Sequence, residues 1–404
     1  MADKRTIKTK HLEEKSFTAA LADIIKNNMR QYTMIIALLL IWSIFTLLTK
    51  GVFIRPRNLS NLFLQMCTIG LLTGGMLLVM VSGNIDLSVG SVCGTLGAIV
   101  AYLMTRAGLH PIIAILITIG CGTLVGCWQG FWVAYRGVPA FIVTLASQIA
   151  FRGLTLLVTN GATIGEFDPG FKIIGQGYIP RLFFKDAPLH DLTMLLTLIA
   201  MVAFVFIEVR RRRKRIAKGF AVLPKSMQLI KLILILAAIG GVGTVLGSYM
   251  GAPYAILILL AVVGVFWVIT TRTPFGRHVY AIGGNREAAR LSGINVKKEM
   301  MKIFIIAGTV SAVASIVFTA RINAATTSAG MLFESDTIAA CIIGGTSTSG
   351  GVGSVFGAII GALVMASLDN GMSLMNLPIM IQYMVKGLIL LVAVWIDIAN
   401  RTKK

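Results

Sequence analysis

Long apolar runs alternate with short polar segments along most of this chain. Each run approaches the ~20 residues that a helix needs to cross a bilayer. The short alternation of apolar and polar residues typical of a transmembrane β-barrel is absent. We expect spans at residues 32–48, 59–81, 87–104, 111–133, 139–158, 192–207, 229–249, 254–271, 303–320 and 379–396. The pattern predicts an all-α polytopic membrane protein with about 12 (10–12) segments.

One further apolar run, 337–368, is interrupted by the sequence GGTSTSGGVG at residues 344–353. A straight helix does not tolerate so many glycines, and irregular backbone inside a bilayer must be buried in protein or line a cavity. We therefore expect a broken Gly-rich helix over 321–353 on a transport path, with a loop outside the membrane as the alternative. Two segments here leave the C-terminus inside, whereas a single span leaves it outside.

Basic residues are concentrated in three segments. Of the 37 Lys and Arg, 22 lie before residue 32, in 210–225 or in 272–302. Such segregation is typical of cytoplasmic loops, so the net charge of +21 does not indicate nucleic-acid binding. Hydrophobic residues make up 56% of the chain and the mean hydropathy is +0.84, a balance that excludes a soluble globular protein.

These patterns together predict the organisation of the chain. A cytoplasmic N-terminal segment (1–31), in which residues 11–29 have helical periodicity, precedes an N-terminal transmembrane bundle (32–271). That bundle includes an extracytoplasmic loop (159–191) and a basic cytoplasmic loop (209–228). A cytoplasmic coupling loop (272–300), a C-terminal transmembrane bundle (301–397) and a C-terminal tail (398–404) follow.

The polar stretch 273–298 is longer than a simple turn between two spans requires. Asn285 is a candidate N-cap and Gly293 a candidate C-terminal stop, so we expect a short helix at about 286–291. The stretch suits a docking surface, although an ordinary charged loop is the alternative.

Polar residues border the expected breaks in the helices. The candidate substrate-path residues are Asn84, Asp86, Ser88, Glu334, Asp336, Thr346, Ser347, Ser349, Asp369 and Asn370. Arg152 and Lys386 lie inside apolar runs, where ionisable groups are costly. Asp369 closes the run at 352–368, and these three ionisable residues either pair with one another or extend to the interface, in preference to contacting substrate.

The sequence VGSVxG occurs at 89–94 and again at 352–357, each time after a polar, acid-bearing segment. It is either an internal repeat, a common plan among transporters, or a chance match in a chain rich in Gly and Val.

The motifs of several enzyme classes are missing. There is no P-loop, since no Gly-Lys pair occurs, and no nucleophile elbow. The four His and five Cys are not spaced as metal ligands or disulfides. We expect no catalytic residues and no bound metal. If ATP drives transport, another chain must hydrolyse it.

Several motifs resemble one protein family. EAAxxxG at 287–293 resembles the coupling-loop signature of permease subunits of bacterial ATP-driven (ABC) importers, and YAIGGNREAARLSGINV is similar to its ribose and xylose branch. The D-xylose and multiple-monosaccharide permeases also resemble this chain at SGNIDLSVGS, WVAYRGVPAFIVTLA, FRG, DTIAACIIGGTSTSGGVGSVFGAIIGALVMASLDNGMS and QYMVKGLILLVAVWID.

The resemblance implies a permease with the fold of the vitamin B12 importer (type II) class, working as a homodimer in the bacterial plasma membrane. Its expected partners are an ABC ATPase with two nucleotide-binding halves, which uses ATP and Mg²⁺, and an extracytoplasmic sugar-binding protein. The permease itself is expected to bind no cofactor. The residues expected to couple to the ATPase are Arg277, Gly283, Gly284, Asn285, Glu287, Ala288, Ala289, Arg290 and Gly293.

The expected function is import of a monosaccharide, with D-xylose as the first candidate. The alternative is a secondary transporter, proton-coupled or facilitative, in which Asp86, Asp369 and Lys386 could relay protons. The spans at 192–207 and 229–249 are an extra pair compared with the shorter ribose permeases, and the basic segment between them could fix orientation or bind anionic lipid.

Overall fold

The computed structural model describes residues 29–183, 187–220, 222 and 224–402. The helix expected around residues 11–29, and almost all of the segment 1–31, lie outside the described residues. The chain divides into two compact units, 1–32 with 178–252 and 33–177 with 253–404.

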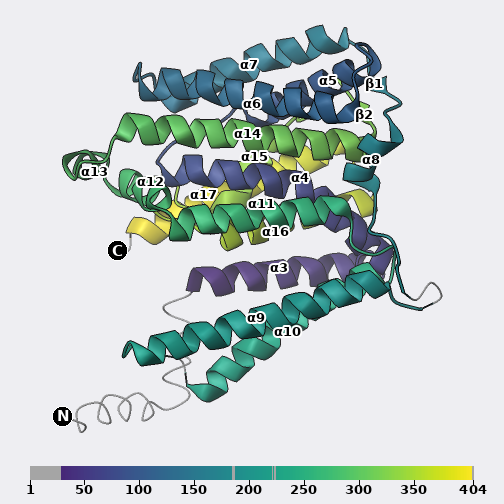
Figure 1. Ribbon diagram of the computed structural model, residues 1–404, viewed down its shortest axis with the longest axis vertical. Coiled ribbons are helices and arrows are strands. Elements are labelled where there is room, and N and C mark those ends of the chain that lie inside the picture. The colour runs from purple at the N-terminus through teal and green to yellow at the C-terminus, as the bar shows by residue number, and fades with distance from the viewer. Residues whose placement is uncertain (1–28, 184–186, 221, 223, 403–404) are drawn as a thin grey trace. The chain divides into compact units, whose positions relative to one another are not determined.

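The larger unit is helical apart from one short strand pair (Figure 1). Its elements are α3 (Met29–Leu48, assigned here from residue 33), α4 (Pro56–Val81), α5 (Val89–Thr105), α6 (Pro111–Ala134), α7 (Ala140–Thr159), β1 (Ile164–Gly165), α8 (Pro169–Gln176), α11 (Tyr254–Arg272), α12 (Pro274–Gly284), α13 (Arg286–Leu291), α14 (Val296–Ile322), β2 (Ala324–Ala325), α15 (Phe333–Ile343), α16 (Val355–Leu374) and α17 (Ile379–Thr402).

The predicted all-α polytopic architecture is confirmed. In the described part of the chain, nine helices are long and apolar enough to cross a membrane. The apolar part of α3 and helix α5 are shorter, and α15 has 11 residues. With these three shorter helices the total agrees with about 12 segments. Most of these helices begin and end within a few residues of the expected positions, because the length of each apolar run determines the length of its helix.

Helices α4 and α14 form the centre of the larger unit. In the most apolar 18-residue stretch of each helix, 94% of the residues of α4 and 78% of those of α14 are buried, whereas none of those of α17 is buried. The two central helices pack against each other, α14 also packs against α6, and α4 packs against α16. The outer helices expose apolar side chains, as expected for surfaces that contact lipid.

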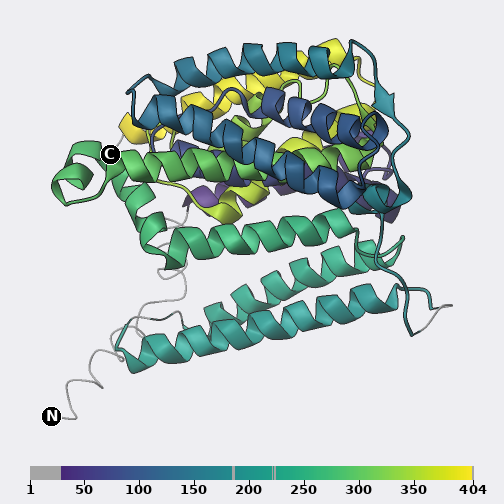
Figure 2. The same ribbon diagram turned by 45° about the horizontal axis from the view of Figure 1, so that its top comes forward.

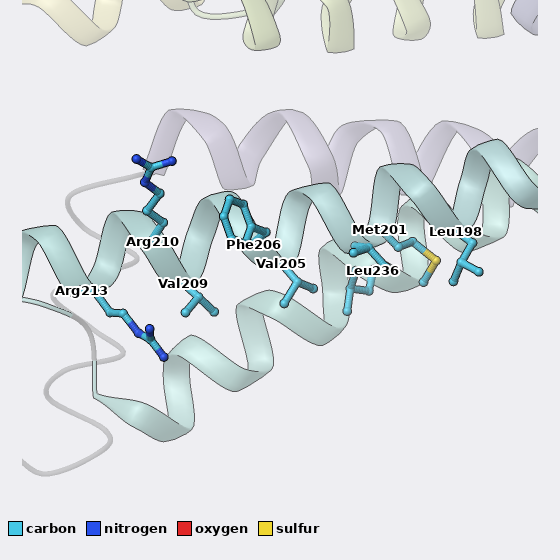
Figure 3. A pocket seen from close by; sticks show the side chains of 9 residues that line it. Leu198, Met201, Val205, Phe206, Val209, Arg210, Arg213 and Leu236 are labelled. Carbon is cyan, nitrogen blue, oxygen red and sulfur yellow. The ribbon is translucent and has the colours of Figure 1, made fainter.

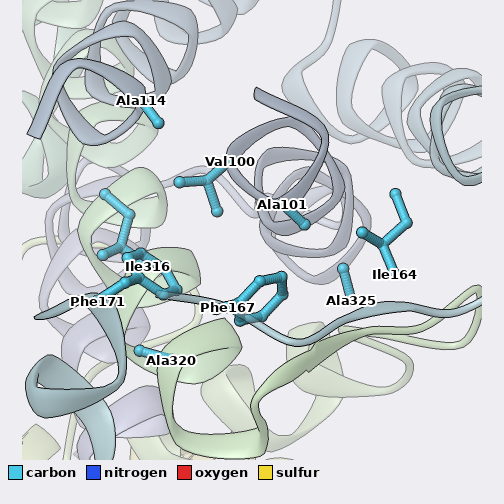
Figure 4. Packing of buried hydrophobic residues seen from close by; sticks show 9 residues of the cluster. All are labelled: Val100, Ala101, Ala114, Ile164, Phe167, Phe171, Ile316, Ala320 and Ala325. Carbon is cyan, nitrogen blue, oxygen red and sulfur yellow. The ribbon is translucent and has the colours of Figure 1, made fainter. Parts of the chain in front are cut away.

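One end of this unit is closed by α8 and the strand pair. Ile164 pairs with Ala325 and Gly165 with Ala324 in antiparallel register. Phe167 and Phe171 insert beside Val100 of α5, in a buried cluster that also includes side chains of α6 and α14 (Figure 4). Helix α8 begins where Asp168 accepts a hydrogen bond from the Gly170 backbone N–H and Pro169 occupies the first turn. We call this the α8 end, and the opposite end, which carries α12 and α13, the α12 end.

The Gly-rich interruption splits the 337–368 run as predicted. Helix α15 ends at Ile343 and α16 begins at Val355. Asp397, near the end of α17, accepts hydrogen bonds from the backbone N–H (3.3 Å) and the hydroxyl (3.1 Å) of Thr348 in the interruption. The last turns of α17 therefore lie beside the interruption.

The VGSV echo does not mark an inverted repeat. Val89 is the first residue of α5, and Ser354, whose hydroxyl accepts a hydrogen bond from the Gly357 N–H, caps α16. Both copies open a helix, but both helices start toward the α12 end and run toward the other end. An inverted pair would run in opposite directions.

The smaller unit contains a helical hairpin, α9 (Asp191–Ala217) and α10 (Lys225–Gly247), which lie side by side (Figure 2). Gly243 permits close packing, since a Cβ there would overlap Thr197. We expected a loop over 209–228, but α9 continues to Ala217 and includes Arg210–Arg215. Arg and Lys are good helix formers, and their long side chains reach water without the backbone leaving the helix.

Candidate coupling and translocation site

Helix α12 turns the chain back at the end of α11. The Thr273 hydroxyl accepts a hydrogen bond from the Gly276 N–H (3.1 Å), and Pro274 occupies the first turn. The sequence analysis missed this helix. The signal was present in the Thr-Pro start and the Gly-Gly end.

Helix α13 spans Arg286–Leu291, where we expected it. Asn285 Oδ1 accepts a hydrogen bond from the Ala288 N–H (2.9 Å), and Gly293 (φ +85°) ends the helix in the left-handed conformation that favours glycine. Ala289 is buried and holds the helix to the protein.

Other side chains of this region face outward. Glu287 and Arg290 form an exposed ion pair at 2.9 Å, and Leu291 is 78% exposed. Arg277 on α12 and Ala288 on α13 are exposed as well. Charged groups beside an exposed leucine form a surface suited to docking a protein.

Helix α12 is also tied to α14. His278 Nδ1 lies 3.2 Å from Glu299 Oε1, and Lys302 Nζ lies 3.2 Å from the same carboxylate. Glu299 is buried in the first turn of α14. The exposed face of α12 and α13 is thereby linked to the N-terminus of a central helix.

The C-terminal end of α12 meets two other backbone segments. A Cβ on Gly283 would overlap the Val81 carbonyl oxygen, at the end of α4, and the Gly351 backbone nitrogen. The Gly351 N–H donates a hydrogen bond to that same Val81 carbonyl (2.8 Å). Gly350 (φ +90°) and Gly351 (φ +75°) are both left-handed. We call this contact of residues 81–83, 283–284 and 350–351 the glycine junction.

Two further contacts reinforce the glycine junction. The Tyr280 hydroxyl donates a hydrogen bond to the Gly353 carbonyl (2.9 Å), and burial raises the pKa of Tyr280. Asn84, just beyond the junction, donates to the Ser82 carbonyl (3.2 Å). By contrast, a Cβ on Gly284 would meet no atom within 4 Å. Of these two adjacent glycines, Gly283 is therefore packed against backbone atoms and Gly284 is not.

The segment between α4 and α5 turns into the protein. Asp86 Oδ1 accepts hydrogen bonds from the Ser88 N–H (2.8 Å) and hydroxyl (2.7 Å), and Gln129 of α6 donates to the Ser88 hydroxyl (2.6 Å). All three side chains are buried. The sequence analysis missed Gln129, although a glutamine inside an apolar run was a signal.

A second turn, between β2 and α15, meets the first turn of α5. A Cβ on Gly90 would overlap the Gly330 carbonyl oxygen and Glu334. Glu334 Oε1 accepts a hydrogen bond from Gln148 of α7 (3.0 Å). Arg152, one turn further along α7, donates to the Ala329 carbonyl (3.0 Å). Two interruptions of helices that are far apart in sequence therefore touch inside the bundle.

The remaining expected path residues form separate contacts. Lys386 of α17 pairs with Asp336 of α15 (2.9 Å) and Asp369 of α16 (2.8 Å). Asn370 exchanges hydrogen bonds with Asn58 of α4 (2.8 and 3.1 Å), away from the interruption. Thr346 and Ser347 are buried in the interruption, and Ser349 is exposed there. The structure therefore does not gather all ten residues in one place.

No group of three or more His, Cys, Asp or Glu that could hold a metal occurs within the described ranges. The five cysteines are free thiols.

The sequence profile of one transport family matches residues 58–394, and its description reads branched-chain amino acid transport system / permease component. The chain belongs to this permease family. It is a multi-pass membrane transport subunit rather than an enzyme, and its helices fit the type II ABC permease fold.

Curated relatives of this permease cover nearly its whole length. It is 45% identical to the xylose transport system permease protein XylH of Haemophilus influenzae, over 93% of this chain and 98% of the relative. It is 43% identical to the protein of that name from Escherichia coli K12, over 93% of each. The ribose import permease protein RbsC of Bacillus subtilis is 32% identical, over 85% of this chain and 86% of the relative. No solved structure matches.

Proposed function

We propose that this protein is the membrane permease of an ATP-driven importer of D-xylose or a related monosaccharide. The identity of 43–45% to two xylose permeases, against 32% to a ribose permease, supports a pentose of the xylose type. The observation that best supports coupling to ATP hydrolysis is the glycine junction. It joins the exposed helices α12 and α13 to the end of α4 and to the Gly-rich interruption between α15 and α16.

The chemistry of the bundle favours a neutral sugar over an amino acid, the substrate class in the family description. The Asp336 and Asp369 carboxylates are both engaged by Lys386. Among the described residues, buried polar atoms without a hydrogen-bond partner include Glu334 Oε2, Ser91 Oγ and Thr346 Oγ1. Sugar hydroxyl groups can donate to and accept from such groups.

ATP hydrolysis belongs to a separate ATPase subunit in this proposal. Its surface receives Glu287, Arg290 and Leu291 of α13. A rigid-body shift of α12 and α13 then moves the end of α4 and the interruption before α16 together, because Gly283 leaves no space for independent movement. The sequence supplies no ATP-binding motif of its own.

The proposal also includes an orientation in the membrane. The α12 end faces the cytoplasm together with the N-terminus, and the α8 end receives a sugar-binding protein outside. Two copies of the permease form a homodimer that seats both halves of the ATPase. The basic segment at 272–302 supports this orientation. In a variant without the five native cysteines, labelling of single cysteines at exposed positions of α13 and α8 with a membrane-impermeant thiol reagent tests sidedness, and crosslinking in intact membranes tests dimer formation.

Reconstitution tests the function. Proteoliposomes containing the permease, the ATPase and the binding protein encoded with it should accumulate labelled xylose when ATP is supplied on the ATPase side. Omitting any component should abolish accumulation. Unlabelled xylose should compete, whereas leucine should not.

Two results would overturn the proposal. Competition by leucine but not by xylose would show that the substrate is a branched-chain amino acid, as in the family description. Xylose uptake by the permease alone, driven by a pH gradient, would support the proton-coupled alternative, in which Asp86, Asp369 and Lys386 relay protons.

A further inference from the structure

The hairpin of the smaller unit carries an open groove of about 790 Å³ (Figure 3). Nearly all of its lining comes from one face of α9, with Leu236 contributed by α10. The apolar floor is formed by side chains such as Leu198, Met201, Val205 and Phe206. Arg210 and Arg213 stand at one end of the row and Leu198 at the other.

The groove has the length of one lipid acyl chain in its leaflet. From Leu198 to Val209 a helix rises about 16 Å, at about 1.5 Å per residue. One leaflet of the hydrocarbon core is about 15 Å thick, half of the ~30 Å core. The apolar part of the groove therefore ends where the hydrocarbon of a leaflet ends, and the arginines begin at that level.

The charged end suits a phosphate group. Arg210 and Arg213 both line this end of the groove, and in Figure 3 their guanidinium groups point to opposite sides of α9. The planar guanidinium presents paired N–H groups that match phosphate oxygens. Glu208, the nearest acid on α9, is engaged by Lys231 (2.5 Å) and Gln228 (3.1 Å) of α10. Because Glu208 is engaged elsewhere, it does not neutralise the two arginines, and this end of the groove stays positively charged.

We propose that this groove is a binding site for an anionic phospholipid. One acyl chain lies along Leu198–Val209, and the phosphate lies at the charged end, between the side chains of Arg210 and Arg213. Charge and apolar length together define the occupant, since a free anion needs no apolar floor and a zwitterionic lipid gains less from two arginines. The site lies within the hairpin and does not depend on the proposed substrate.

Lipid retention tests the site in the full-length permease. The protein is purified in mild detergent with equal amounts of phosphatidylglycerol and phosphatidylcholine, and bound lipid is counted by native mass spectrometry. Wild type should retain phosphatidylglycerol in preference. Arg210→Gln with Arg213→Gln should reduce that retention about tenfold, the scale expected for two lost contacts between exposed charges.

The matched control is Arg212→Gln with Arg215→Gln. It removes the same charge at the same spacing on the same helix, but neither residue lines the groove. Its retention should stay within twofold of wild type. Equal losses in both double variants would show a general charge effect and overturn the site. No preference for phosphatidylglycerol in wild type would also overturn it, as expected if protein covers the groove.

A third variant tests the apolar part. Val205→Trp fills the groove without changing charge, and it should also reduce phosphatidylglycerol retention. Inorganic phosphate at millimolar concentration should not displace the lipid if the acyl chain contributes. If phosphate displaced the lipid fully and Val205→Trp retained phosphatidylglycerol as well as wild type does, the site would bind only an anion. That result would overturn the lipid assignment.

Discussion

Two basic segments of this chain give the same signal in sequence and have different structures. Residues 210–225 hold eight Lys and Arg, and residues 272–302 hold seven. The first continues a helix beyond its apolar part, with exposed side chains along an open groove. The second folds back as α12 and α13, whose glycines approach buried backbone. The charge of a segment predicts on which side of the membrane it lies, whereas helix caps and glycines determine whether the segment packs against the rest of the protein.

The largest expected effect lies at the glycine junction. Gly283→Ala places a methyl group against the Val81 carbonyl and the Gly351 nitrogen, and backbone atoms cannot move aside as a side chain can. Overpacking of this kind typically costs about 1–3 kcal/mol. We expect ATP-dependent sugar uptake to fall about tenfold or more.

Gly284→Ala is the control for that prediction, since a Cβ there has open space. Its uptake should stay within twofold of wild type. Co-purification of the ATPase with each variant separates lost docking from lost transmission. Normal uptake by the Gly283→Ala protein would contradict the mechanical role of the glycine junction.

A smaller effect is expected in the hairpin. Gly243→Ala brings a methyl group against the Thr197 side chain, which can change rotamer, so we expect destabilisation of about 1 kcal/mol at the low end of overpacking. Gly241→Ala has open space in the same helix and should stabilise it by about 0.5–1 kcal/mol, because alanine is the better helix former, so the cost at Gly243 is read against this control. Thermal unfolding in detergent measures both. If Gly243→Ala impaired uptake as strongly as Gly283→Ala, the contrast between the two segments would fail.

Tyr280→Phe removes one hydrogen bond of the glycine junction. The lost bond to the Gly353 carbonyl should cost about 0.5–1.5 kcal/mol. Because burial raises the pKa of Tyr280, the unfolded chain loses this proton first as the pH rises. Stability should therefore fall with rising pH above the ordinary tyrosine pKa of about 10.

That loss of stability should be smaller in Tyr280→Phe, which has no proton to lose at this position. Unfolding measured from pH 8 upward compares the two proteins. An identical pH dependence in both would show that Tyr280 does not contribute.

The smallest effect on stability is expected at the docking surface. Glu287 and Arg290 are 72% and 66% exposed, and exposed ion pairs contribute ~0–1 kcal/mol. Glu287→Gln should leave the unfolding temperature unchanged while it weakens ATPase binding, measured by co-purification. The salt-dependence of that binding should also decrease. Full ATPase binding by Glu287→Gln would remove this residue from the docking surface.

Much of the fold follows from local sequence. The apolar runs placed the spans, the glycines of 344–353 split the penultimate run, and Asn285 with Gly293 bounded α13. Helix α12 was missed although its Thr-Pro start was visible. The contacts of Gln129 with Ser88 and of Gln148 with Glu334 were not predicted, because each joins helices whose relative rotation is not encoded in any single segment.

The sequence by itself determined which segments are apolar helices, where they begin and end, and which segments are basic, because hydration and local backbone preference act along the chain. Only the tertiary structure decided that Gly283 meets Val81 and Gly351, and that Arg152 finds the Ala329 carbonyl. It also decided that the two VGSV copies open parallel helices. These contacts depend on packing between helices distant in sequence, where the shape of each surface and the lack of space for a Cβ select one arrangement.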